Sequence, residues 1–244
     1  MPLGSPLPRA DSHGDCIYLD YQATTPIWPE VADAAEPYLR LHWGNPSSGH
    51  AFGRSCKSAV DGARTACASL LGAEPEEIVF LSCGSEADNH AIVGPLQLEE
   101  ARRRAAHSTG AELPLPHAVS SVIEHPAVVE CLAALEAAGR IRVTLVGVDF
   151  EGRVSAAEVA AAVTLETVIV TIMHSNNEVG SLQPIEEIVR LIRSGSTNPD
   201  VLIHTDAAQS VGKVCCATYS TPCKLPTHTL SHTSTLHTCA YCSL

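Results

Sequence analysis

Four polar side chains follow apolar runs that have the length and composition of buried strands. They are, in chain order, His125, Asn176, Asn177 and Asp206. Open α/β sheets bind ligands at the carboxyl ends of their strands, so we expect these side chains to meet at one edge of a sheet. Such an edge would bring an imidazole, two amides and a carboxylate to a single cavity.

Asp206 is the most informative of the four. It follows the apolar run at 201–203, and the small residues Ala207 and Ala208 come after it. A buried carboxylate is costly unless it is paired, so a cation is expected beside it: a protonated pyridine nitrogen, an arginine or a metal ion. The alternative is that Asp206 caps the helix that follows. Gln209, three residues further on, could donate a hydrogen bond to a ring oxygen.

The turn SCGS at 82–85 joins a predicted strand to a predicted helix. Its small residues let backbone N–H groups approach an anion, and the helix N-terminus adds partial positive charge, so phosphate is the natural guest. An ordinary tight turn is the alternative, and the segment is neither a P-loop nor a GxGxxG fingerprint. His125, Asn176 and Asn177 are likewise open to two interpretations, as binding groups or as hydrogen-bonded turn formers.

A phosphate cradle, an imidazole that stacks on a ring, an amide and a buried carboxylate together form the set that pyridoxal phosphate requires. The carboxylate matters most, because the pyridinium must stay protonated to act as an electron sink.

The elements that must position these groups alternate along the chain. Helices are predicted over 31–41, 55–71, 86–106, 126–138 and 184–193, with a short Ala-rich helix after Ser155. Strands are predicted over 78–81, 118–123, 142–148, 167–173 and 201–205. This alternation predicts an α/β fold, with a mostly parallel sheet covered by helices on both faces.

Composition limits the class of protein. The 244 residues are 45% hydrophobic and 17% charged, with a net charge of −12, which argues against nucleic acid or an anionic membrane as the main partner. No stretch approaches eighteen uninterrupted apolar residues, so no membrane span is expected. Residues 1–15 lack the apolar core of a secretory signal, and we interpret them as a flexible leader on a cytosolic protein.

Composition changes after Val214. Residues 215–244 hold five Cys, three His and seven Thr but no Asp or Glu. A CxxC pair at 239–242 with nearby histidines could in principle bind zinc, but a single pair is weak support. We therefore expect no metal site, and we interpret this tail as unrelated, disordered sequence that follows an incomplete domain over 16–214.

Six segments occur in the order found in one enzyme family. They are CIYLDYQATTP (16–26), GNPSSGHAFGR (44–54), FLSCGSEADNH (80–90), IEHPAV (123–128), MHSNNEVG (173–180) and HTDAAQSVGK (204–213). In this the chain resembles the cysteine desulfurases and selenocysteine lyases, class V pyridoxal-phosphate enzymes of the aspartate aminotransferase fold (fold type I). Among them it looks most similar to the selenocysteine lyases.

The resemblance implies a role for each cofactor-binding position. Gly84 and Ser85 match the residues that hold the phosphate, and Asn177 matches the amide near the ring oxygen and the substrate carboxylate. Asp206 matches the partner of the pyridinium nitrogen, and Gln209 matches the residue that contacts the phenolic oxygen.

The resemblance also implies the reaction. His125 matches the histidine that stacks on the ring and transfers protons. The substrates implied are L-selenocysteine and perhaps L-cysteine, which are cleaved to alanine with release of selenium or sulfur, and the family's enzymes are homodimers.

This sequence departs from the family at its C-terminal side. The family's Ser-x-His-Lys motif, whose lysine forms the Schiff base, does not occur, and the three lysines present are Lys57, Lys213 and Lys224. The loop with the catalytic Cys and the small domain are also missing. We expect little or no turnover, and the alternative function is a non-catalytic truncated isoform that at most binds a full-length partner. The strand at 78–81 would lack its neighbours, and the phosphate loop would be loosely held.

Overall fold

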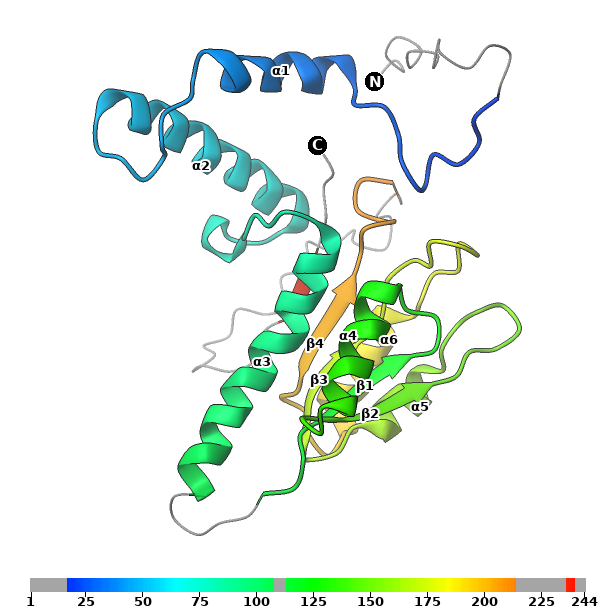
Figure 1. The fold of residues 1–244 in the computed structure, drawn as a ribbon. Coiled ribbons are helices and arrows are strands. Elements are labelled where there is room, and N and C mark those ends of the chain that lie inside the picture. The colour runs from blue at the N-terminus through cyan, green and yellow to red at the C-terminus, as the bar shows by residue number, and fades with distance from the viewer. Residues whose placement is uncertain (1–16, 108–112, 214–235, 240–244) are drawn as a thin grey trace. The chain divides into compact units, whose positions relative to one another are not determined.

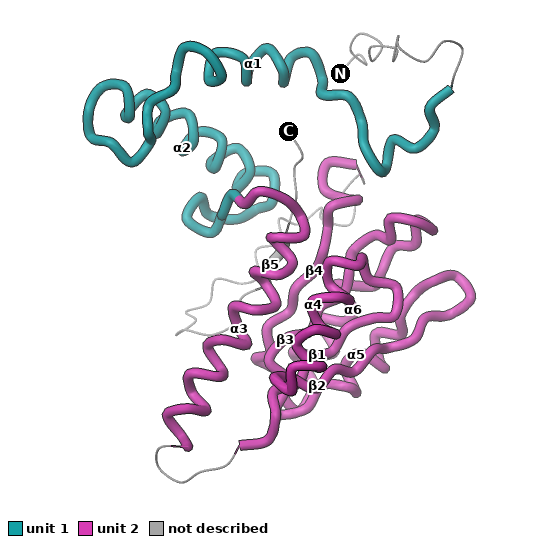
Figure 2. Tube along the Cα trace, viewed as in Figure 1, with its two compact units in different colours: residues 1–80, 222–224, 244 teal, residues 81–221, 225–243 magenta. Residues whose placement is uncertain are grey.

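The computed structural model describes residues 17–107, 113–213 and 236–239 (Figure 1). These residues fall into two compact units (Figure 2). Unit 1 contains residues 17–80, and unit 2 contains residues 81–213 with the short segment 236–239. The predicted leader and most of the predicted tail lie outside the described residues.

Unit 1 is built from helices: α1 (Pro29–Arg40), α2 (Ala51–Leu71) and a 3-10 turn, η1 (Pro75–Glu77). Proline in the first turn starts α1. At α2, the His50 side chain accepts a hydrogen bond from the Gly53 N–H, and Gly72 ends the helix with a φ of 69°. These local signals explain why the helices predicted over 31–41 and 55–71 form.

Unit 2 is a parallel sheet whose strands alternate with helices. The strands are β1 (His117–Ser121), β2 (Arg142–Val146), β3 (Thr167–Thr171), β4 (Leu202–Asp206) and β5 (Leu236–Cys239). The helices are α3 (Gly84–His107), α4 (Pro126–Ala137), α5 (Ala156–Ala162) and α6 (Ile185–Gly195). The strand order is β2-β1-β3-β4-β5, and every described pairing is parallel. The predicted α/β fold is confirmed.

Helices cover both faces of this sheet. Ala118 of β1 packs with α3 and α4, whereas the next residue, Val119, packs with α5 and α6. Ile169 and Val170 of β3 divide in the same way. Because successive side chains of a strand point to opposite faces, this division defines two apolar layers on the two sides of the sheet.

One predicted element is wrong. Residues 78–81 do not form a strand, and the side chains of Val79 and Phe80 are 64% and 49% exposed. A strand requires a neighbour for its backbone N–H and C=O groups, and no described strand pairs with this segment. The guanidinium of Arg64 instead donates to the Ile78 carbonyl at 3.1 Å and lies 5.4 Å from the Phe80 ring centre.

Strand β5 is the one part of the tail that the structure describes. It pairs with β4 in parallel, from Ile203 with Leu236 to Asp206 with Cys239. The rest of the tail, 214–235 and 240–244, lies outside the described residues, and with it most of the predicted disordered segment and most groups of the zinc alternative. None of the helices in the described ranges is both long enough and apolar enough to span a bilayer.

Candidate functional site

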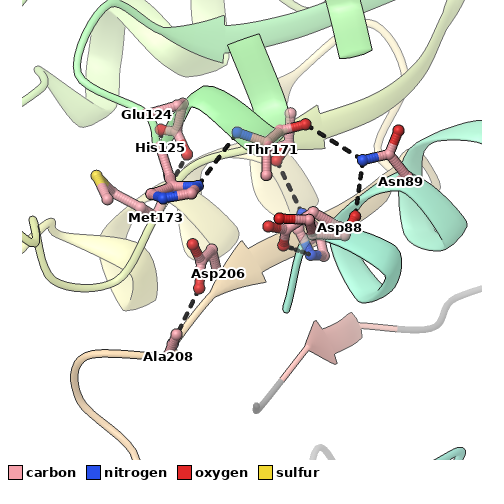
Figure 3. A network of polar contacts seen from close by, with 11 residues as sticks. Asp88, Asn89, Glu124, His125, Thr171, Met173, Asp206 and Ala208 are labelled. Carbon is pink, nitrogen blue, oxygen red and sulfur yellow. Dashed lines mark hydrogen bonds and ion pairs between the residues drawn. The ribbon is translucent and has the colours of Figure 1, made fainter. Parts of the chain in front are cut away.

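The predicted site residues of unit 2 lie where strands end. Asp206 is the last residue of β4, His125 follows β1, and Asn177 follows β3. Strands β1, β3 and β4 are parallel neighbours, so their carboxyl ends share one edge of the sheet. The structure thus brings these three residues to the same edge, and Figure 3 shows the neighbourhood of Asp206 and His125 there.

Asp206 is partly buried at this edge. Its Oδ1 accepts a hydrogen bond from the Ala208 N–H at 2.9 Å and so fixes the turn that follows. The alternative interpretation, a cap on a following helix, is wrong for the described residues, because 208–213 form turns and no helix. Its carbonyl oxygen accepts from the His174 N–H at 2.7 Å, which ties the end of β4 to the chain after β3. One oxygen of the Asp206 carboxylate therefore fixes the turn, and the carboxylate can still pair with a cation.

Two further carboxyl groups, Asp88 and Glu124, lie near Asp206 (Figure 3). Asp88 is only 3% exposed, and its Oδ1 is 3.7 Å from Nε2 of His204. Nδ1 of the same histidine is 2.8 Å from the Thr171 hydroxyl. The carboxylate of Glu124, 7% exposed, accepts the Met173 N–H at 2.9 and 3.0 Å.

The two buried carboxyls resist ionisation. Burial raises the pKa of Asp88 to about 7, and the negative charge of Asp206 acts in the same direction. Burial also raises the pKa of Glu124 to about 7, against hydrogen bonds from Ser121 and Met173 that lower it. Asp206 and Asp88 raise the Glu124 pKa further. Ionisation of either buried carboxyl is therefore opposed by burial and by the charge of Asp206, and a cation bound beside Asp206 would reduce this opposition.

Sequence reasoning did not single out Asp88 or Glu124. For Asp88 a signal was present: it lies four and eight residues before Ile92 and Leu96, which are the buried residues of the α3 face against the sheet. Glu124 directly precedes His125 in a predicted turn, where a charged side chain is normally solvated. Nothing in its local sequence indicates burial.

His125 begins α4. Its Nδ1 accepts a hydrogen bond from the Ala127 N–H at 3.1 Å, which places the proton of the neutral ring on Nε2. The residue is exposed, so the ring is accessible to a flat ligand. The two interpretations of His125, a hydrogen-bonded turn residue and a ring-stacking residue, are therefore compatible, because the turn uses only Nδ1 of the ring.

The SCGS turn leads into α3, which begins at Gly84. The side chain of Glu86 accepts the Ser82 N–H at 2.6 Å and so shapes the turn. Asn89, one turn into the helix, donates to the Ser85 carbonyl at 2.7 Å and to the Ala127 carbonyl at 3.4 Å. This amide, which sequence reasoning also missed, links the start of α3 to the start of α4.

The remaining predicted residues differ in surroundings. Asn176 is buried, and its Oδ1 accepts the N–H groups of Glu178 and Val179. Asn177 is partly exposed beside it. Gln209 is partly buried, and its Oε1 accepts a hydrogen bond from the Lys213 ammonium at 3.0 Å.

The residues present fit pyridoxal phosphate. The first N–H groups of α3 have no carbonyl partners within the helix, so a phosphate at Gly84 and Ser85 would satisfy them. The carboxyl cluster of Asp206, Asp88 and Glu124 favours a cation such as a pyridinium.

The fold and the site define an α/β domain whose candidate ligand-binding residues lie at the carboxyl edge of a parallel sheet. Residues 17–221 match the model of the aminotransferase class-V family, and the chain belongs to that family. Class V aminotransferases are pyridoxal-phosphate enzymes.

Named relatives include cysteine desulfurases and selenocysteine lyases. The chain is 41% identical over 198 residues to a cysteine desulfurase of Trichormus azollae, covering 81% of this chain and 45% of the relative. It is 38% identical over 205 residues to a selenocysteine lyase of Xenopus tropicalis, covering 81% and 48%. The chain thus spans about half the length of the curated relatives it matches.

Solved structures agree with this assignment. A NifS-like protein matches with a TM-score of 0.72 at 33% identity, covering 80% of this chain and 50% of that one. SspA in complex with cysteine matches with a TM-score of 0.67 at 35% identity, covering 79% and 51%.

Proposed function

We propose that the carboxyl edge of unit 2 binds pyridoxal phosphate without a covalent link. The observation that carries this proposal is the convergence of three carboxyl groups: Asp206 at the end of β4, Glu124 in the turn after β1, and Asp88 in α3. Asp206 holds the proton on the pyridine nitrogen, and the start of α3 at Gly84 and Ser85 holds the phosphate.

The other predicted residues complete the site. The His125 ring, whose Nδ1 accepts from the Ala127 N–H, would stack on the ring of the cofactor, and its Nε2–H would be available for proton transfer. The amide of Asn177 would lie near the ring oxygen and the carboxylate of an amino-acid substrate. Gln209 would contact the phenolic oxygen of the cofactor. The bound cofactor would supply the electron sink for cleavage of the bond between Cβ and the chalcogen.

The names of the relatives support a substrate class. We propose L-selenocysteine or L-cysteine, cleaved to L-alanine, as the substrate of the family's full-length enzymes. A polypeptide of these 244 residues is proposed to turn over little or not at all, since its lysines are Lys57, Lys213 and Lys224 and none stands in a Ser-x-His-Lys motif. Its alternative role is that of a non-catalytic isoform bound to a full-length partner.

We further propose a cytosolic location and homodimeric assembly, as the family resemblance implies. Four cysteines, Cys56, Cys67, Cys83 and Cys131, are free thiols, as is usual for proteins of the reducing cytosol.

The binding proposal is tested by equilibrium dialysis of the chain against pyridoxal phosphate and against pyridoxal. The phosphate form should bind at least about tenfold more tightly, because only it engages the start of α3. Asp206→Asn keeps the acceptor for the Ala208 N–H but removes the charge, and it should weaken binding by about tenfold or more.

Asp149→Asn is the matched control. Asp149 is an exposed aspartate in a turn, and its Oδ1 accepts the N–H groups of Glu151 and Arg153 at 2.9 and 3.0 Å. Its replacement should leave affinity unchanged. Equal affinity of the wild type and Asp206→Asn, or equal binding of the two ligands, would refute the proposed site.

A further inference from the structure

We propose that Glu124 and Asn176 are positioning residues which brace the turn after β1 against the turn after β3, and thereby hold His125 and Asn177 toward the cofactor. This inference rests on the proposed function. Its basis is a pair of side chains, one in each turn, that each make hydrogen bonds to the backbone of the other turn.

Glu124 reaches from the first turn to the second. Both of its carboxylate oxygens lie within 3.0 Å of the Met173 N–H, 49 residues away in sequence. Ser121, the last residue of β1, donates its hydroxyl to the same carboxylate. The Glu124 side chain thus connects the end of β1 to the segment that follows β3 (Figure 3).

Asn176 reaches in the other direction. Its Nδ2 donates to the Ile123 carbonyl at 2.9 Å, a separation of 53 residues. Its Oδ1 accepts the N–H groups of Glu178 and Val179 at 2.9 and 2.8 Å, which shapes its own turn. One amide therefore closes the local turn with its oxygen and connects to the neighbouring turn with its nitrogen.

Sequence adjacency makes these connections relevant to the site. Glu124 directly precedes His125, and Asn176 directly precedes Asn177. In each pair the first residue is buried, at 7% and 8% exposure, and the second is accessible. A buried side chain that is fixed by hydrogen bonds restricts the backbone of the next residue, so the accessible side chain keeps one orientation.

The groups around Glu124 favour its neutral form. Burial and the nearby carboxyls of Asp206 and Asp88 raise the pKa of Glu124 to about 7. A neutral glutamine has nearly the same shape as neutral glutamic acid, and its amide oxygen still accepts from Met173 and Ser121. Glu124→Gln should therefore preserve the brace, and Glu124→Ala should remove it.

The first arm of the test is hydrogen exchange of the full chain without cofactor, followed by mass spectrometry of peptides that cover 122–128 and 173–180. Glu124→Ala should speed exchange about tenfold in both peptides. Asn176→Asp keeps the acceptor for Glu178 and Val179 but loses the donor to Ile123, and it should speed exchange of 122–128 as well.

Two variants serve as controls in this arm. Glu124→Gln should exchange like the wild type. Glu136→Ala removes a glutamate that connects α4 to β2 through the Val143 N–H at 2.9 Å, and it should leave both peptides unchanged. Unchanged exchange in both Glu124→Ala and Asn176→Asp would overturn the brace, and Asn176→Asp decides this even if Glu124→Ala does not fold.

The second arm measures affinity for pyridoxal phosphate by fluorescence titration, with urea unfolding of each variant as a stability reference. Glu124→Ala and Asn176→Asp should each weaken binding about tenfold, and Glu124→Gln should restore it. Faster exchange with unchanged affinity would overturn the positioning role. If the wild type binds no pyridoxal phosphate, the proposed function fails, and the exchange arm still decides whether the turns depend on each other.

Discussion

Unit 1 and unit 2 differ in how they use apolar residues. Unit 2 buries two continuous apolar clusters against the faces of its sheet. In unit 1, α1 contains no buried residue, and α2 buries only Gly53, Cys56 and Ala68. Leu19, Leu39 and Trp43 are 86%, 81% and 73% exposed.

This contrast separates two sources of structure. The helices of unit 1 are defined by proline starts, a histidine cap and a glycine end, which are local features of the sequence. The strands of unit 2 are defined by burial between helices that are distant in sequence. Short helices are marginal in water without tertiary packing, so unit 2 should be far more stable than unit 1.

The largest expected effect is in hydrogen exchange. Amides of β1, β3 and α6 should exchange at least about a hundredfold more slowly than those of α1, because the former open only on global unfolding. Exchange followed by mass spectrometry, corrected for intrinsic rates, measures this ratio. Equal protection in α1 and β3 would show that unit 1 has a packed core of its own and that the two units do not differ in stability.

A second prediction compares leucines of the two units. Leu132→Ala in α4, where the side chain is 1% exposed, should lower the free energy of unfolding by about 2–5 kcal/mol. Leu39→Ala in α1, where the side chain is 81% exposed, should change it by less than about 0.5 kcal/mol. Urea unfolding followed by circular dichroism measures both, and similar losses would remove the distinction between the units.

A third prediction concerns pH. The pKa values of Asp88 and Glu124 rise on folding from 3.8 and 4.5 to about 7, so between those values the folded chain binds more protons than the unfolded chain. Their ionisation therefore destabilises the fold as pH rises through that window, and the destabilisation levels off above about pH 7.

Asp88→Asn and Glu124→Gln should remove this loss. Relative to the wild type, each variant should gain about 1–3 kcal/mol of unfolding free energy at pH 8 compared with pH 5. Urea unfolding at the two pH values measures the gain, with Glu136→Gln as an exposed control. Lower stability of the variants at both pH values would instead mean that the folded chain stabilises the two carboxyls as anions.

The sequence predicts the elements well where local signals suffice. The helix of α4 is bounded by His125 with Pro126 at one end and by Gly139 at the other, and its prediction is confirmed within one residue. The strand over 78–81 was predicted from apolar residues alone and is wrong. A strand depends on its neighbours in the sheet, and pairing between distant segments is not encoded locally.

The same distinction applies to the site. Asp206 and His125 are predicted as site residues because ligand-binding groups of α/β sheets follow strands, which is a pattern along the chain. Glu124 and Asp88 were missed because their importance depends on burial against the chain after β3 and against His204, respectively. Tertiary packing decides which acidic residues are desolvated, and neighbouring sequence does not.

The most direct test of non-covalent cofactor binding without turnover is to incubate the chain with pyridoxal phosphate, reduce it with borohydride, and map adducts by mass spectrometry. Alanine release from L-selenocysteine is assayed in parallel. We predict cofactor that dialyses away, no specific adduct at Lys57, Lys213 or Lys224, and no alanine above background. A stoichiometric adduct on one of these lysines together with alanine formation would refute non-covalent binding without turnover, because one of the lysines would then form the Schiff base with the cofactor.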